Sequence, residues 1–220
     1  MRRRRPSTYF SPAWCLSQPY TCGTPPTLSH CRSSEGSAVE ISPKLAITLN
    51  ALALYAISAV LAVAFYWQFA YGELPCPLCM LQRASFSALA VGPVLAIRHG
   101  PKPQHYGLTI LAALMGASIA ARQILLHIMP GDPGFGSLLL GMHFYTWAFL
   151  AFVAAILAAA VMLTFGGQFA ATERPPRLGT LEKGAVWLVI GLTAMNAASA
   201  LAECGFGSCP ANPVRYELFN

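Results

Sequence analysis

Charged side chains are scarce in this sequence of 220 residues: they make up 10% of it, whereas 55% of the residues are hydrophobic. The mean hydropathy is +0.53. This scarcity of charge excludes an ordinary soluble domain, in which about a quarter of the residues are charged. The composition therefore predicts an integral membrane protein.

The features of a cleaved export signal are also missing near the start of the chain. Arg2 and Arg3 suggest a twin-arginine signal, but no apolar segment or small-residue cleavage site follows them closely. Residues 1–43 are rich in Ser, Pro and Thr and lack apolar periodicity, which predicts a disordered cytoplasmic tail. We interpret the three irregularly spaced cysteines of this tail as inert. They are Cys15, Cys22 and Cys31.

Long uncharged runs, by contrast, are plentiful. They cover residues 45–72, 107–121, 133–172 and 184–202. A further apolar run at 84–97 is too short to cross a bilayer, but a helix that begins near Cys76 extends it to about 20 residues. The sequence therefore predicts an all-α membrane protein with a four-helix transmembrane bundle and a fifth, C-terminal transmembrane helix. Its expected parts are the core at 44–165, a cytoplasmic linker at 166–182, the fifth helix at 183–203 and a periplasmic tail at 204–220.

Basic residues gather on one side of the membrane if the five helices alternate in direction. Eleven of them precede the first helix or lie in the loops after the second and fourth helices: Arg2, Arg3, Arg4, Arg5, Arg32, Lys44, Arg98, Lys102, Arg174, Arg177 and Lys183. The positive-inside rule predicts that this side is cytoplasmic, with the C-terminus on the periplasmic side. A net charge of +6 could also indicate a nucleic-acid partner. Since the basic residues lie in loops on one side, we expect membrane lipid and no nucleic acid.

The most specific motif is P-C-P-L-C-M-L-Q-R at residues 75–83, between two apolar runs. A C-x-x-C dithiol is the minimal unit of reversible disulfide chemistry. If a helix begins near Cys76, the unpaired N–H groups of its first turn favour a thiolate at Cys79. Arg83 lies four residues further along, on the same helix face, and favours the thiolate as well.

A second cysteine pair, Cys204 and Cys209, follows the fifth helix. Alternation places it on the same non-cytoplasmic face as Cys76 and Cys79, which is what a two-step thiol relay requires. A purely structural disulfide is one alternative. A zinc ion shared by the two pairs is another, although the nearby Arg83 disfavours a cation, and we expect no metal site.

The remaining candidates are polar residues near helix ends. Arg83 either snorkels toward the lipid headgroups or stabilises negative charge that develops on a bound quinone, and we favour the second role. Arg122, Gln123 and His127 form a polar stripe near the outer end of the third helix. We treat these three as secondary candidates for cofactor binding, with an interfacial arginine and bridging waters as the alternative.

With Cys76, Cys79 and Arg83 opening the second helix, residues 44–165 resemble the DsbB family of bacterial membrane thiol oxidoreductases. The resemblance implies an inner-membrane enzyme that reoxidises a periplasmic thioredoxin-fold protein, DsbA, and passes the electrons to ubiquinone or menaquinone. It also implies that Cys79 is the quinone-proximal thiolate, that Cys76 is its disulfide partner and that Arg83 contacts the quinone. The family carries its second cysteine pair in the second outer loop, whereas residues 129–137 contain no cysteine.

Cys204 and Cys209 thus look like a relocated substitute for that pair. We expect a partner thiolate to attack their disulfide, and the released thiolate to reduce the disulfide of Cys76 and Cys79. Cys79 then attacks the quinone. A vitamin K epoxide reductase-like quinone reductase is an alternative, but its C-x-x-C is expected in the final core helix. A non-catalytic membrane assembly factor whose outer cysteines bind metal is another.

Overall fold

The apolar runs of the sequence form long helices in the computed structural model, which describes residues 41–169, 178–210 and 213–219. The helices are α1 (Pro43–Ala70), α2 (Pro77–Leu89), α3 (Val91–His99), α4 (Pro103–Leu126), α5 (Phe144–Thr164) and α6 (Thr180–Cys204). The minor elements are β1 (Leu138–Leu139), β2 (Met142–His143), η1 (Gly166–Phe169) and η2 (Glu217–Phe219). Of the described residues, five segments are long and apolar enough to span a membrane, with α2 and α3 forming one span. This confirms the predicted all-α membrane protein.

Proline determines where several of these helices begin and break. Pro43, Pro77 and Pro103 each lie in the first turn of a helix, where the backbone N–H that proline lacks is not needed. Pro93 lies inside the second span. Because its ring crowds the carbonyl of the residue four positions earlier, the span is interrupted at Ala90, between α2 and α3.

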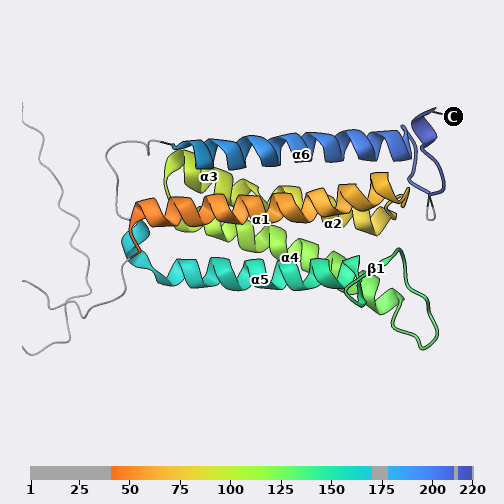
Figure 1. The fold of residues 1–220 in the computed structure, drawn as a ribbon. Coiled ribbons are helices and arrows are strands. Elements are labelled where there is room, and N and C mark those ends of the chain that lie inside the picture. Colours follow the sequence, from red (N-terminus) through yellow and green to blue (C-terminus); the bar gives the residue numbers. More distant parts are fainter. Residues whose placement is uncertain (1–40, 170–177, 211–212, 220) are drawn as a thin grey trace, which may run out of the picture. The chain divides into compact units, whose positions relative to one another are not determined.

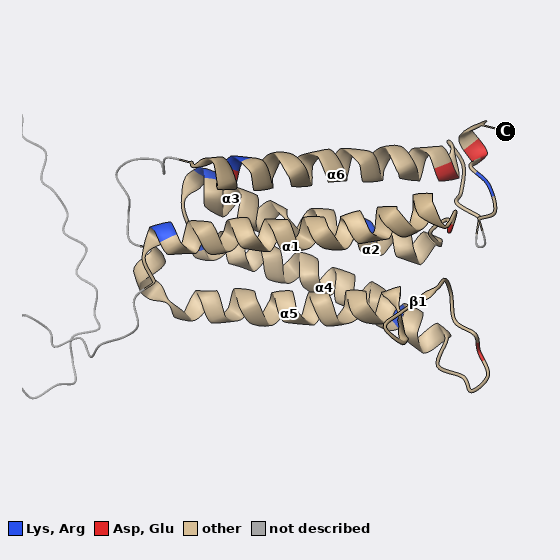
Figure 2. Cartoon of the chain, in the orientation of Figure 1, with Lys and Arg blue, Asp and Glu red and all other residues tan. Residues whose placement is uncertain are grey.

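Consecutive spans among the described residues run in opposite directions (Figure 1). The beginning of α2, the end of α6 and the loop at 127–143 therefore lie at one end of the bundle (Figure 1). Both described cysteine pairs belong to this end, as the alternation predicts. Most of the described Lys and Arg residues lie at the other end, where α1 begins (Figure 2).

Small side chains on α4 let α5 approach closely. Ala113, Gly116, Ala117 and Ala120 are buried at helical spacing along one face of α4. Phe152 of α5 packs against Gly116. Its ring stacks on the ring of Phe86 from α2, with the ring centroids 4.2 Å apart. These small side chains therefore allow a close approach of the two helices.

α6 packs along α1 and begins three residues before the expected start at 183. Gly179 caps it, and Glu182 lies in its first turn, where a carboxylate is favourable beside unpaired backbone N–H groups. Ala185 and Val189 are buried, and the Tyr55 hydroxyl donates to the Leu181 carbonyl at 3.2 Å. The predictions for residues 1–40 and for about half of the linker, at 170–177, lie outside the described residues.

Candidate redox site

The C-x-x-C motif forms the start of α2. Cys76 is the N-cap residue, and its Sγ accepts a hydrogen bond from the Cys79 N–H at 3.2 Å, as a Ser or Asp side chain would in the same position. Pro77 occupies the first helical position. Cys79 therefore lies in the first turn, as the sequence predicts, and both cysteines are free thiols.

Gln123 of α4 binds both of these sulfurs. Its Nε2 donates to Cys76 Sγ and to Cys79 Sγ, each at 3.4 Å, while its Oε1 accepts from Gln82 Nε2 at 2.7 Å. Its side chain is buried. The hydrogen bond with Cys79, followed by burial, raises the pKa of the Cys76 thiol. When this pair of thiols loses one proton, the remaining proton therefore stays on Cys76, and Cys79 becomes the nucleophile.

Arg83 is fixed by acceptors from α1. Its Nη1 donates to Gln68 Oε1 at 2.6 Å, its Nη2 donates to the Ala64 carbonyl at 3.0 Å, and the guanidinium lies 5.2 Å from the centre of the Phe65 ring. A snorkelling arginine would direct these donors to water or lipid headgroups instead. The observed hydrogen bonds hold the positive charge inside the bundle.

A cavity of about 380 Å³ lies beside Cys79 and Arg83. Its wall is mostly apolar and comes from α1, α2, α5 and the loop at 127–143. Aromatic residues contribute to it, namely Trp67, Phe135, Phe144, Tyr145 and Trp147. Its size and its few polar groups are typical of a pocket for a small aromatic ligand. The residues present therefore fit a quinone ring.

The loop at 127–143 is held in place where it forms part of this wall. Glu73 accepts hydrogen bonds from the backbone N–H and the hydroxyl of Ser137, and Trp147 Nε1 donates to the Leu139 carbonyl at 2.9 Å. Further along the loop, Asp132 accepts from the Gly134 N–H at 2.8 Å. This bond, helped by the nearby His127, lowers the pKa of the Asp132 carboxyl.

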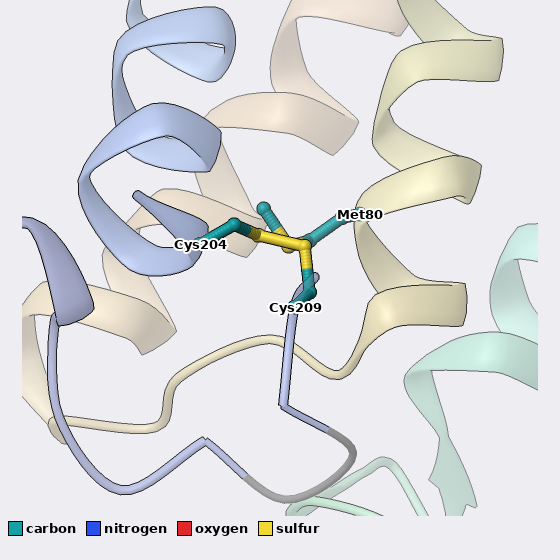
Figure 3. Close-up of a disulfide and its surroundings, with 3 residues drawn as sticks. All are labelled: Met80, Cys204 and Cys209. Carbon is teal, nitrogen blue, oxygen red and sulfur yellow. A yellow bond between two sulfur atoms is a disulfide. The ribbon is translucent and has the colours of Figure 1, made fainter. Parts of the chain in front are cut away.

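The second cysteine pair is a disulfide that lies against α2 (Figure 3). Cys204 Sγ is 3.8 Å from Sδ of Met80, the residue that follows Cys79. Cys209 is exposed and Cys204 is partly buried. Phe206, between them, is 94% exposed. The structure thus places the outer disulfide beside the first turn of α2, and Cys209 is its more exposed residue.

The secondary candidates separate from one another. Arg122 is exposed, and His127 Nδ1 lies 3.1 Å from Asp132 Oδ1. Neither lines the cavity, and Gln123 does not line it either, because its amide is directed at the sulfurs. Of the three, the structure places only Gln123 in contact with the cysteine pair.

Sequence reasoning missed several residues that the structure places around the site. Gln68, Gln82 and Glu203 are buried next to the reactive groups or their partners. All three are polar residues at or near the ends of apolar runs. This position could have identified them as site candidates, because polar side chains at membrane depth usually have a specific partner. The aromatic lining of the cavity gave no such signal, since aromatic residues are common at membrane interfaces.

Comparisons with known proteins relate the chain to one family. The sequence model of the family described as "Disulfide bond formation protein DsbB" matches residues 47–137. A protein named Disulfide bond formation protein B from Azoarcus sp. (strain BH72) is 32% identical over 150 residues, which is 64% of this chain and 90% of that protein.

Two proteins of the same name match a shorter region. The one from Xanthomonas axonopodis pv. citri is 43% identical over 86 residues, 37% of this chain and 50% of the relative. The one from Marinobacter nauticus is 43% identical over 79 residues, 34% of this chain and 47% of the relative. The chain therefore spans about half the length of these two relatives and most of the length of the Azoarcus protein. No solved structure matches the chain significantly.

Proposed function

Because the chain belongs to the DsbB family of disulfide bond formation proteins, we propose that it oxidises the dithiol of a periplasmic thioredoxin-fold protein and passes the electrons to ubiquinone or menaquinone. The observation that carries the proposal is that Cys79 and Arg83 share the wall of one apolar cavity, with a second disulfide beside the same turn of helix. The enzyme would lie in the bacterial inner membrane with this end of the bundle in the periplasm.

Electrons enter at the outer pair. Cys209 is the more exposed residue of the disulfide, so a partner thiolate attacks its sulfur and Cys204 leaves as a thiolate. The second thiol of the partner then attacks the mixed disulfide. The partner leaves with a disulfide, and Cys204 and Cys209 are left reduced.

Electrons next pass to the inner pair. The Cys204 sulfur lies beside Met80, in the first turn of α2, so it is close to the Cys76 and Cys79 disulfide when that pair is oxidised. Attack by Cys204 opens the inner disulfide, and Cys209 then closes the outer one again. The products are an outer disulfide and two free inner thiols, which is the arrangement in the structure.

Cys79 is the exit for the electrons, because it is the member of the inner pair that reaches the cavity. Gln123 donates to its sulfur, and Cys76 keeps the remaining proton. A quinone bound in the cavity supplies a two-electron acceptor that regenerates the inner disulfide. Arg83 adds a fixed positive charge beside the place where negative charge develops, and a charge held in advance inside a dry site stabilises such a state strongly.

Quinone reduction by the purified full chain tests this function. We expect the protein in detergent to reduce a short-chain ubiquinone with dithiothreitol as the electron donor, as measured by the loss of quinone absorbance. Cys76→Ser and Cys79→Ser should each abolish this activity, because a single thiol cannot form the inner disulfide. Cys15→Ser, in the N-terminal tail, is the matched control and should leave the rate unchanged. Full activity in either inner-pair variant would end the proposal.

A further inference from the structure

Glu203 is a buried acidic residue that the relay described so far does not use. It lies in the last turn of α6, and only 1% of its surface is exposed. Its Oε2 is buried and has no hydrogen bond partner among the described residues. Burying a carboxyl group in this way is costly, so its presence at a reactive site needs a reason.

Along α6, Glu203 lies between Ser199, which Gln68 links to Arg83, and Cys204 of the outer disulfide. Ser199 precedes it by one helical turn, so the two side chains share a face of α6. The Ser199 hydroxyl accepts from Gln68 Nε2 at 2.8 Å, and Gln68 Oε1 accepts from Arg83. On the other side, Glu203 is followed directly by Cys204, whose sulfur lies against Met80.

The polar and titratable groups near Glu203 come from α2, from α1 and from the C-terminal segment. From α2, Arg83 and Cys79 are close enough to interact with its charge. From α1, the group on this face is the neutral amide of Gln68, which also donates to the hydroxyl of Tyr216 in the C-terminal segment at 3.2 Å. Two charged neighbours of Tyr216 pair with each other instead: Arg215 Nε lies 3.6 Å from Glu217 Oε1.

We propose that Glu203 carries protons from the outer cysteine pair to the inner pair during exchange, an inference that rests on the proposed function. The Cys204 thiol gives its proton to the Glu203 carboxylate as its sulfur attacks the inner disulfide. The inner S–S bond breaks, and the leaving thiolate takes that proton from Glu203. Cys209 then attacks the mixed disulfide, and its proton follows the same route to the second leaving thiolate.

The proton balance closes without any further reactant. Two electrons and two protons leave Cys204 and Cys209 and arrive at Cys76 and Cys79, and Glu203 returns to its starting form. A nearby acid–base group is useful here because Glu203 and Cys76 are buried, so water has little access to the place where the leaving thiolate must receive a proton. The free Oε2 of Glu203 is available for this purpose.

A two-phase oxidation isolates the exchange step. The full chain carries Ser at the three tail cysteines, is reduced completely, is freed of reductant and is then mixed with excess short-chain ubiquinone in a stopped-flow instrument. The first equivalent of quinol reports oxidation of Cys76 and Cys79. The second equivalent appears only as the outer pair transfers its electrons inward, so its rate measures the exchange.

In Glu203→Gln, we expect the first phase to keep its rate and the second to slow by about a hundredfold near neutral pH, the usual contribution of an acid–base group. The dependence of the second phase on pH should also flatten, which the loss of a purely structural contact would not cause. Glu203→Asp keeps the acid and should recover part of the rate. Glu182→Gln, at the opposite end of α6, is the matched control and should behave as the parent.

Two outcomes would overturn the inference while leaving the proposed function intact. One is a second phase of unchanged rate in Glu203→Gln. The other is a second phase slowed by the same factor at every pH in both Glu203 variants, because that pattern indicates lost packing. Absence of the first phase in the parent protein would instead overturn the proposed function itself, and the inference with it.

Discussion

Gln123 is a neutral residue whose position controls the chemistry of the two inner sulfurs. One amide nitrogen donates to both Cys76 and Cys79, and Gln82 fixes the orientation of that amide by donating to its oxygen. Inside a protein a hydrogen bond to a charged group contributes about 1.5 to 3 kcal/mol. Gln123 therefore stabilises a thiolate at Cys79 in addition to the backbone of the first helical turn.

Replacing this amide should make the nucleophile less reactive. We expect Gln123→Leu to slow alkylation of Cys79 by iodoacetamide at neutral pH by about tenfold, since tenfold corresponds to about 1.4 kcal/mol. The modified peptides can be followed by mass spectrometry, and the outer disulfide protects the other pair. Arg122→Leu, the exposed neighbour on the same helix, is the matched control and should leave the rate unchanged. An equal rate in Gln123→Leu and the parent would contradict this role.

The sequence predicted the individual residues of the motif better than their partners. A helix that begins near Cys76, as the length of the apolar run requires, places Cys79 in a first helical turn with Arg83 one turn further on. The partners of these residues come from other helices: Gln68 from α1 and Gln123 from α4. A helical stripe shows which residues share a face, but not which neighbouring helix that face meets.

Among the helices, α4 and α5 show how one small residue controls the packing of a whole element. A Cβ atom at Gly116 would overlap the Phe152 ring, which is fully buried and stacks on Phe86. Neither ring has free space, so an added methyl group must shift α5. Because α5 also carries part of the cavity wall, the shift would reach the redox site.

We expect Gly116→Ala to destabilise the bundle by about 1 to 3 kcal/mol, the usual cost of overpacking a filled core. Thermal unfolding in detergent, followed by circular dichroism, should show a lower midpoint temperature. Gly107→Ala in the same helix is the matched control, because a Cβ there meets no atom within 4 Å. That change should be neutral or slightly stabilising, since Ala favours a helix over Gly. Equal midpoint temperatures for the two variants would contradict this prediction, because they would show that the side chains around Phe152 can move to accommodate the added methyl group.

Helix lengths were predictable because the thickness of a bilayer fixes them, and the described residues contain five spans, as expected. The exact ends of the helices and the breaks within them were harder to predict. The interruption at Ala90 follows from Pro93, but the hydropathy of the run does not change there and does not reveal the break. The early start of α6 includes Glu182, a charged residue that the prediction assigned to the cytoplasmic linker.

For the whole molecule, alternation of the spans predicted that both cysteine pairs meet at one end, but not that α6 lies along α1. That neighbour relation brings the outer disulfide to Met80 and the buried Glu203 toward Arg83. It depends on side-chain packing over a sequence separation of more than a hundred residues. The second cysteine pair therefore follows the fifth helix, whereas the loop at 127–143 has no cysteine.

The charges of the molecule predict its orientation. Figure 2 shows most of the Lys and Arg segments at the end where α1 begins and most of the Asp and Glu segments toward the other end. Among the described residues, Lys44, Arg98, Lys102 and Lys183 lie at or next to the helix ends on the first side. The positive-inside rule places the first end in the cytoplasm. With this predicted orientation the outer disulfide would face the periplasm, where a disulfide persists and a secreted partner can reach it.

Labelling of intact bacteria tests this orientation. After mild reduction, a membrane-impermeant maleimide should modify Cys209, which is exposed, in cells whose outer membrane alone has been opened. Lys183→Cys, at the opposite end of α6, should stay unlabelled until the inner membrane is broken. Mass spectrometry of the two peptides separates these sites from the other cysteines. If Lys183→Cys reacted first, the redox site would face the reducing cytoplasm, where the proposed oxidation of an exported protein cannot take place.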